Sequence, residues 1–307
     1  MLNPQLDRRG ELIHLLTTEG LPRRHVERLL DAARVLAENA APAAAPLPVF
    51  LSLPDDPACR DAYAEAAARL SLLPVVLDAP EADAQAGDAL ARTVAGLAPG
   101  VLVLRHAASG AAHCAAAHAA PGLRVVSAGD GWHADPLPAL ALVQAMRDIK
   151  QDLTHLAVTL VGDIRHSPVA RSVIHVMTTL GVPEVRAVAP RTLLPDNLPQ
   201  LGVRACATLQ EGLQDADVII VLPLDVERIS GALLPSAREY AQVYGLTPAA
   251  LAAAKRDALL LPAGALTPGV EVDGDVAASL PPIEAQLAGQ LQSLRVATLH
   301  VLTEDAP

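Results

Sequence analysis

The 307-residue sequence contains very few aromatic residues and almost no lysine. Phenylalanine, tryptophan and tyrosine together make up 2% of the chain, although 51% of its residues are hydrophobic. A core of this composition must be built by close packing of Ala, Leu, Val and Ile side chains. Lys150 and Lys255 are the only lysines, so arginine carries nearly all positive charge. This bias fits bidentate recognition of anions by arginine or, more simply, a bias in the base composition of the genome.

Paired cysteines and long apolar runs are also absent. Cys59, Cys114 and Cys206 form no Cys-x-x-Cys pair, which fits a reducing compartment. No run of about 18 residues is free of charge and proline, and the first residues lack the apolar core of a signal peptide. The formal net charge of −11 argues against nucleic acid or an anionic membrane as a partner. We therefore expect a cytoplasmic protein with no nucleic-acid or membrane partner.

Short apolar runs alternate with helical patterns along the chain, which is typical of a parallel sheet with crossover helices. The predicted strands of the first half are 48–53, 74–77, 100–106 and 123–128, and the helices between them are 57–70, 87–97 and 109–119. The predicted strands of the second half are 155–162, 184–189, 216–222 and 257–262, with helices at 168–180, 208–214, 235–243 and 247–255. Further helices are predicted at 21–39, 136–150 and 279–302, and a proline-rich linker at 40–48.

Two such blocks predict an α/β fold with two similar lobes, each a parallel sheet flanked by helices, and a cleft between the lobes. We expect the first lobe over 1–135, a linking helix over 136–150 and the second lobe over 151–280. A C-terminal helix over 281–307 completes the predicted organisation.

Seven blocks of the sequence, in the same order, resemble the aspartate carbamoyltransferase catalytic chain, of the aspartate/ornithine carbamoyltransferase superfamily. They are MLNPQLDRRGELIHLLTTEGLP, VLRHAASG, SAGDGWHADP, LVGDIRHSPVAR, TTLGVPEVRAVAPRTLLP, GALLPSAREYAQVYGLTP and PGVEV. The likeness covers essentially the whole length, and several blocks in one order are more specific than any single motif.

The resemblance implies a first lobe that binds carbamoyl phosphate, a second lobe that binds aspartate, and a last helix that returns to the first lobe. In that family, which serves pyrimidine biosynthesis, the amino group of aspartate attacks the carbamoyl carbonyl and phosphate leaves. No metal or organic cofactor takes part, and trimers place active sites between subunits. Catalysis therefore rests on positioning and on cationic and hydrogen-bond donors around an anionic transition state.

The resemblance also places the first-lobe site positions, most of which are altered. The family's phosphate loop, Ser-Thr-Arg-Thr-Arg, corresponds to Asp56, Pro57, Ala58, Cys59 and Arg60, so alanine replaces its phosphate-binding arginine. The lysine lent by a neighbouring subunit corresponds to Ala86, and the His-Pro-Thr-Gln motif begins at Asp135 and ends at Pro138. The chemistry of the carbamoyl phosphate site is retained at Arg105 and His106, and Arg60 is retained with a mostly structural role.

The second-lobe positions are altered in the same way. The aspartate-binding arginine of LVGDIRHSPVAR corresponds to Pro168. The Arg-x-Gln loop corresponds to Pro223 through Asp225, the His-Pro-Gly-Pro loop begins at Pro262 and Ala263, and its downstream arginine is Pro268.

Several of these replacements favour the start of a helix or remove a hydrogen-bond donor. Asp56 supplies an acceptor at a helix N-cap and Pro57 suits the first helical position, so the pair makes a strong helix start. A carboxylate there occupies the position that a phosphate would otherwise use. Ser167 and Pro168 make a second such start. At the histidine position, an ionised Asp135 cannot donate a hydrogen bond to a carbonyl oxygen.

The histidines do not form a convincing metal site in the sequence. His113, Cys114 and His118 share one predicted helix. The two histidines are five positions apart, which is poor spacing for two ligands on one face, so we interpret them as structural and expect no metal. Cys59 sits at a helix N-terminus, which can lower the pKa of a thiol. The neighbouring Asp55 and Asp56 oppose thiolate formation.

Together these observations predict a catalytically impaired or inactive homologue of aspartate carbamoyltransferase. Loss of one preorganised oxyanion donor costs about 10²–10³ in rate, and several donors are replaced here. We expect a structural or regulatory subunit without cofactors, in a homo-trimer or in a hetero-oligomer with an active carbamoyltransferase or dihydroorotase-like chain. One alternative is a divergent transferase that acts on another substrate through Arg105 and a remodelled cleft, and another is a small-molecule sensor without turnover.

Overall fold

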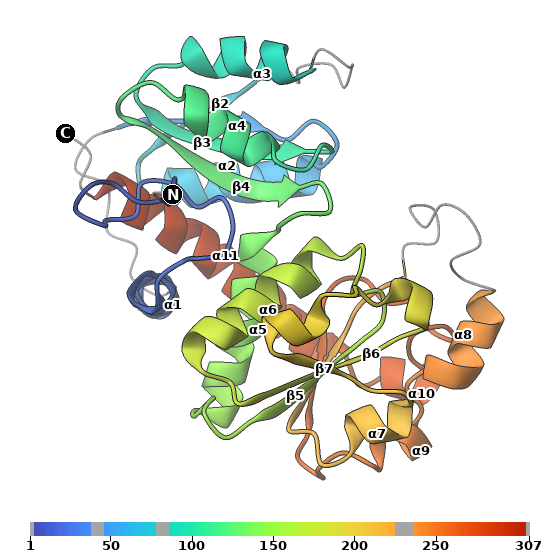
Figure 1. Ribbon diagram of the computed structural model, residues 1–307. Helices are drawn as coiled ribbons and strands as arrows, with labels where there is room; N and C mark the ends of the chain where they lie inside the picture. The colour runs from blue at the N-terminus through green and yellow to red at the C-terminus, as the bar shows by residue number, and fades with distance from the viewer. Residues whose placement is uncertain (1–2, 38–45, 78–85, 225–235, 305–307) are drawn as a thin grey trace. The chain divides into compact units, whose positions relative to one another are not determined.

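A computed structural model describes residues 3–37, 46–77, 86–224 and 236–304 of the chain (Figure 1). The chain divides into two compact units, and each is built around its own parallel sheet. The first unit comprises Met1–Ala141 and Gly289–Pro307, and the second comprises Leu142–Ala288. Within the described ranges, no helix combines the length and hydrophobicity that crossing a bilayer requires.

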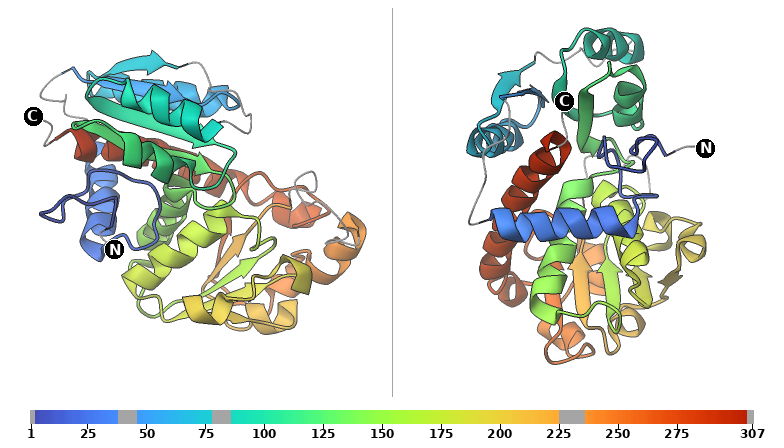
Figure 2. Two further views of the ribbon diagram at one scale, coloured as in Figure 1. Left: turned by 45° about the horizontal axis from the view of Figure 1, so that its top comes forward. Right: turned by 90° about the vertical axis from the view of Figure 1, so that its left-hand side faces the viewer.

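The first unit contains a four-stranded parallel sheet in the order β2-β1-β3-β4. Its strands are β1 (Pro48–Ser52), β2 (Leu73–Val76), β3 (Gly100–His106) and β4 (Leu123–Asp130). Its helices are α1 (Arg23–Leu36), α2 (Pro57–Arg69), α3 (Ala86–Ala95), α4 (Ala111–His118) and the C-terminal part of α11 (Pro281–Thr303). Helices α3 and α4 cover one face of this sheet and α2 covers the other (Figures 1 and 2). The central strand β3 is buried over most of its length, because parallel strands are covered on both faces.

The second unit contains a five-stranded parallel sheet in the order β7-β6-β5-β8-β9. Its strands are β5 (Ala157–Val161), β6 (Glu184–Val188), β7 (Val203–Ala205), β8 (Val218–Val221) and β9 (Leu259–Pro262). The helices are α6 (Pro168–Leu180), η1 (Arg191–Leu193), η2 (Leu198–Leu201), α7 (Leu209–Leu213), α8 (Ala237–Tyr244), α9 (Pro248–Leu251) and α10 (Gly274–Ala277), while α5 (Pro136–Lys150) begins in the first unit. Helices α5 and α6 lie on one side of the sheet, opposite α7, α9 and α10 (Figure 1).

The predicted fold class is confirmed, because two parallel sheets flanked by helices are present. The predicted strands and the longer helices agree with the structure to within a few residues. The helix predicted at 247–255 is shorter, since α9 ends at Leu251, and the predicted linker at 40–48 overlaps β1 at Pro48; residues 40–45 of that linker lie outside the described residues. Strand β7 and helix α10 were not predicted, because three or four residues are too few to show a periodicity.

The segment before α1 is bound along β4, the edge strand of the first sheet. Leu15 donates its N–H to the carbonyl of Val125 and accepts from the N–H of Ser127, both at 2.8 Å. The buried His14 continues this pairing, because its Nδ1 accepts from the N–H of Val125 at 2.9 Å. Burial, and then the positive charge of Arg124, lowers the pKa of His14 to about 4. The imidazole is therefore neutral in the folded protein at neutral pH.

This neutral histidine makes the stability of the protein depend on pH. The pKa of His14 is about 4 when folded and about 6.5 when unfolded, so below pH 6.5 the unfolded chain takes up a proton that the folded chain does not. We expect the free energy of unfolding to fall as the pH decreases from about 6.5 to 4, by up to about 3 kcal/mol from this group. His14→Asn should reduce that slope, because the Asn oxygen can accept from Val125 and does not titrate. Urea unfolding at several pH values would measure it.

His118→Asn is the matched control, because His118 is exposed on α4. This variant should keep the wild-type pH slope. Equal slopes for His14→Asn and the wild type would show that His14 does not carry the effect.

Candidate functional site

The carboxyl ends of the strands in the first unit bring several charged side chains together. Ligands in open α/β sheets usually bind at this edge. Asp56 follows β1 and caps α2, Arg105 is the penultimate residue of β3, and Asp135 immediately precedes α5. A fourth charged residue, Arg295, comes from the part of α11 that belongs to this unit. These four residues form what we call the β1–β3 cluster.

The carboxylate of Asp56 is held by two different donors. Its Oδ2 accepts from a guanidinium nitrogen of Arg105 at 2.8 Å, and its Oδ1 accepts from the N–H of Cys59, in the first turn of α2, at 2.9 Å. Pro57 occupies the first position of the helix, as the sequence predicts. A phosphate bound at this helix N-terminus would use the same guanidinium and the same kind of backbone donor. The chain therefore places its own carboxylate at a helix N-terminus that could otherwise receive an anion.

Gly129 of β4 leaves room for the side chain of Arg105. Gly129 has a φ of +127°, and a Cβ added there would lie 3.4 Å from Cγ of Arg105. The Arg105 side chain therefore lies against bare backbone of β4. Its side chain remains 38% exposed and that of Asp56 28% exposed, so the ion pair is screened by water.

Arg295 is the member of the cluster that the sequence analysis missed. One guanidinium nitrogen lies 3.9 Å from Sγ of Cys59, another donates to Gln292 at 3.1 Å, and the guanidinium carbon lies 5.4 Å from the ring centre of Tyr63. Its Nε is buried and makes no hydrogen bond with the described part of the chain. The sequence shows only that Arg295 is the single arginine or lysine of the final helix, which does not indicate its neighbours.

The surroundings of the β1–β3 cluster change the acidity of Asp135 and Cys59. Burial raises the pKa of Asp135 to about 6, although Arg105 and Arg295 oppose the rise and Asp56 adds to it. Burial also raises the pKa of the Cys59 thiol, against the effect of Arg295. Cys59 is therefore a neutral thiol near pH 7, in agreement with the prediction that thiolate formation is disfavoured.

The other first-unit positions that the resemblance marks make contacts within their own segments or lie in the first turns of helices. Arg60 pairs with Asp61, the next residue, at 3.0 Å, so its guanidinium does not join Arg105. The ring of His106 accepts from the N–H of Ala108 at 3.0 Å. The remaining altered positions of this unit lie in the first turns of helices: Ala58 in α2, Ala86 at the start of α3 and Pro138 in α5.

In the second unit, His166 and Arg165 of the loop before α6 bond to groups of their own unit. Ser167 accepts from the N–H of Ala170 at 3.1 Å and Pro168 begins the helix, so the predicted cap is confirmed. His166 is bonded to Asp163 at 2.8 Å, and Arg165 donates to the carbonyl of Leu194 at 2.6 Å. Pro168, the position at which the resemblance would place an aspartate-binding arginine, is therefore part of a helix start.

A buried glutamate organises the altered loops of the second unit. Glu271 is 1% exposed, and its two oxygens accept from the N–H of Leu224 at 2.7 Å and of Thr267 at 2.8 Å. It therefore joins the segment after β8 to the segment after β9. The altered positions are Pro223 after β8, Pro262 at the end of β9, and Ala263 and Pro268 after β9, while Asp225 lies outside the described residues. The sequence shows PGVEV only as a block that resembles the family, and it gives no signal of this role of Glu271.

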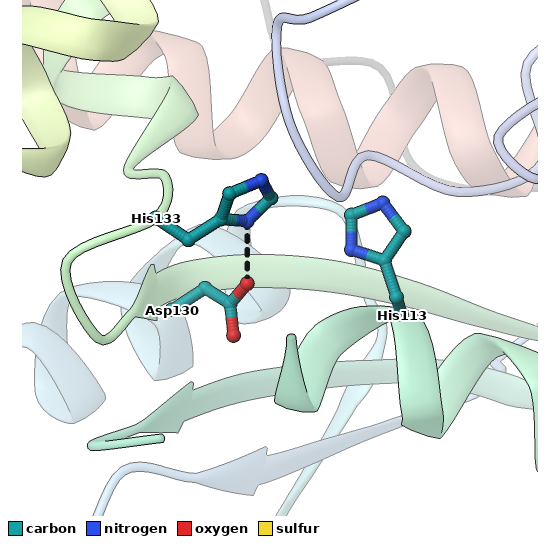
Figure 3. Close-up of side chains that lie close together, drawn as sticks. All are labelled: His113, Asp130 and His133. Carbon is teal, nitrogen blue, oxygen red and sulfur yellow. Dashed lines mark hydrogen bonds and ion pairs between the residues drawn. The ribbon is translucent and has the colours of Figure 1, made fainter. Parts of the chain in front are cut away.

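The histidines of α4 separate into two environments. His118 is bonded to the carbonyl of Cys114 at 2.9 Å and so lies along its own helix. His113 instead lies beside His133, with ring centres 5.5 Å apart, and close to the carboxylate of Asp130 (Figure 3). Burial and then His133 lower the pKa of His113. The grouping that the sequence analysis considered on one helix is thus replaced by one that joins α4 to the end of β4.

The fold is that of the carbamoyltransferases. Ornithine carbamoyltransferase from Thermus thermophilus superposes with a TM-score of 0.78 at 19% identity, covering 98% of this chain and 100% of that one. Aspartate transcarbamoylase from Trypanosoma cruzi, in complex with carbamoyl aspartate and phosphate, gives 0.76 at 19% identity, with 98% and 100% covered. Ornithine carbamoyltransferase from Gloeobacter violaceus gives 0.77 at 19% identity, with 95% and 99% covered. The sequence matches no protein-family profile.

The role of Glu271 gives a prediction about stability. Glu271→Gln replaces one acceptor oxygen by an NH₂ group that faces a backbone N–H, which leaves a buried donor unpaired. We expect the free energy of unfolding to fall by about 1–3 kcal/mol, measured by urea denaturation. Glu284→Gln, at an exposed position on α11, should change it by less than about 0.5 kcal/mol. Equal stability of the two variants would contradict a role for Glu271 in joining the loops.

Proposed function

We propose that this chain is a carbamoyltransferase-fold protein that does not transfer carbamoyl groups and acts as a structural or regulatory subunit. The observation that carries the proposal is the bond between Arg105 and Asp56 at the N-terminus of α2. Arg105 and the N-terminus of α2 are the two features best suited to bind a phosphate. In this arrangement both bind the carboxylate of Asp56 instead.

The ion pair alone is too weak to exclude a ligand. Partly exposed pairs contribute about 0–1 kcal/mol, so a phosphate could displace Asp56 from Arg105 at small cost. The repulsion between an incoming phosphate and the Asp56 carboxylate is the larger effect. Two like charges 4 Å apart repel by about 4 kcal/mol at the effective dielectric constant near a protein surface. Asp56 stays tethered at this helix start with Asp55 beside it, and Ala58 supplies no compensating charge.

The position of Asp135 also opposes carbamoyl transfer. The resemblance places it where the family has the histidine that polarises the carbamoyl carbonyl. With a pKa of about 6, Asp135 is mostly ionised at neutral pH, and an ionised carboxylate accepts hydrogen bonds without donating them. Removal of one such donor lowers a rate by about 10²–10³, so the combined replacements predict turnover below detection.

The proposed assembly is a homo-trimer or a hetero-oligomer with an active carbamoyltransferase or dihydroorotase-like chain. An exposed apolar edge supports an interface in the first unit. Leu73 and Val76 of the edge strand β2 are 53% and 61% exposed. Exposed apolar residues on an unpaired strand edge are typical of surfaces that contact another chain. Native mass spectrometry of the purified protein, alone and after tagged co-purification, would identify the assembly.

A second candidate function is a divergent transferase that acts on a less anionic substrate. The observation that favours it is the pair Arg105 and Arg295 next to Asp135, whose pKa is shifted toward neutrality. Strongly perturbed acids gather at functional sites, although structural ion-pair networks perturb acids as well. Turnover of carbamoyl phosphate with an amine other than aspartate or ornithine would support this candidate and overturn the first.

Removal of the internal anion should create a phosphate site. Asp56→Ser keeps an N-cap oxygen and frees Arg105. We expect millimolar binding of inorganic phosphate and carbamoyl phosphate to this variant, seen as a rise of a few degrees in melting temperature at tenfold excess over Kd. The wild type should show no shift with either ligand or with a bisubstrate phosphonate.

Asp55→Ser removes the same charge from the adjacent residue, which is exposed. This control should behave like the wild type. A clear shift of the wild-type melting temperature, or turnover with aspartate or ornithine, would overturn the proposal.

A further inference from the structure

We propose that His113, Asp130 and His133 form a binding site for a divalent transition metal of the zinc class. Each residue offers one ligand atom, and these atoms all lie within 4.8 Å of one another. Figure 3 shows both imidazole rings facing the carboxylate at the end of β4. The three residues lie in the first unit and include none of the β1–β3 cluster. Such a site departs from the expectation of no metal that the sequence analysis reached.

Asp130 positions two of the ligands at once. It is fully buried at the end of β4, and its oxygens accept from the N–H groups of Gly110 at 3.0 Å and Ala112 at 3.4 Å. These donors belong to the N-terminus of α4, so the carboxylate fixes the helix that carries His113. The distance between Asp130 and His113 is therefore set by a helix cap and a strand, both of which are rigid elements.

A tight turn brings His133 back over Asp130. Asp130 donates its N–H to the carbonyl of Ala134 at 2.9 Å, and His133 donates its N–H to the carbonyl of Asp130 at 2.9 Å. Gly131 has a φ of +57°, and a Cβ there would lie 2.6 Å from the carbonyl oxygen of Ala107. The turn thus requires glycine, and it places Nδ1 of His133 2.8 Å from Oδ2 of Asp130.

The ligand types and spacing suit this class of metal. Two imidazole nitrogens and one carboxylate oxygen are a typical three-ligand set for Zn²⁺, with a fourth position left open. Metal–ligand bonds of about 2.0–2.2 Å place the ligands of a tetrahedral ion about 3.3–3.6 Å apart. The observed separations run from 2.8 Å to within 4.8 Å, so shifts of about 1 Å suffice. Binding at Nδ1 of His133 requires that ring to carry its proton on Nε2.

A helix cap explains only part of this arrangement. Capping α4 requires Asp130, and a hydrogen bond to Asp130 occupies one nitrogen of His133. Neither accounts for a second imidazole, His113, beside the same buried carboxylate.

Zinc titration of the full-length protein tests the site. After treatment with EDTA and dialysis, we expect the wild type to bind one Zn²⁺ per chain with a micromolar or tighter Kd, measured by isothermal titration calorimetry. His113→Gln and His133→Gln should each weaken binding at least tenfold, because each removes a ligand atom. Co²⁺ should give the visible absorption bands of a tetrahedral ion without a thiolate charge-transfer band, which is a readout that needs no variant.

The controls lie on the same helix. His118→Gln and Cys114→Ser should bind Zn²⁺ like the wild type, since neither residue belongs to the three-residue site. Asp130→Asn is unsuitable, because it also removes the cap of α4. A wild-type Kd for Zn²⁺ weaker than about 100 μM, or binding by the His113→Gln and His133→Gln variants equal to that of the wild type, would overturn the proposal.

Discussion

The carboxylate of Asp56 is the constraint on which the candidate site depends. One side chain completes the start of α2 and neutralises Arg105, so the stability of the helix and the occupation of the anion position cannot be separated. A helix N-terminus attracts negative charge whether that charge belongs to a ligand or to the chain. Here a side chain of the protein satisfies that attraction, because the Asp56 carboxylate accepts from the N–H of Cys59 and from Arg105.

The same exchange of roles recurs at other positions where the resemblance would place substrate-binding residues. Ser167 and Pro168 form a helix start, and Glu271 joins the segments that contain Pro223 and Pro268. Each change substitutes a group that stabilises the folded chain for one that would hold an anion. Under the proposed function, the fold common to carbamoyltransferases persists without the family's anion-binding groups, because packing of the two sheets does not depend on those groups.

Much of the architecture could be predicted because the physical signals are local. Apolar runs of strand length alternate with longer helical patterns, and this order requires parallel strands with crossovers. Elements of three or four residues, such as β7 and α10, could not be predicted, because so few residues show no hydrophobic periodicity. The helix caps at Asp56 and Ser167 could be predicted for the same local reason, since a cap involves residues only three apart.

The remaining features depend on residues that are distant in sequence. Arg295 contacts Cys59 across more than two hundred residues, and His113 meets His133 only because β4 and α4 are joined through the buried Asp130. The sequence by itself determined the elements and their order along the chain. Tertiary structure alone decided which charges neutralise one another and which histidines converge, because Coulombic and metal–ligand interactions act over a few ångströms in space, whatever the separation along the chain.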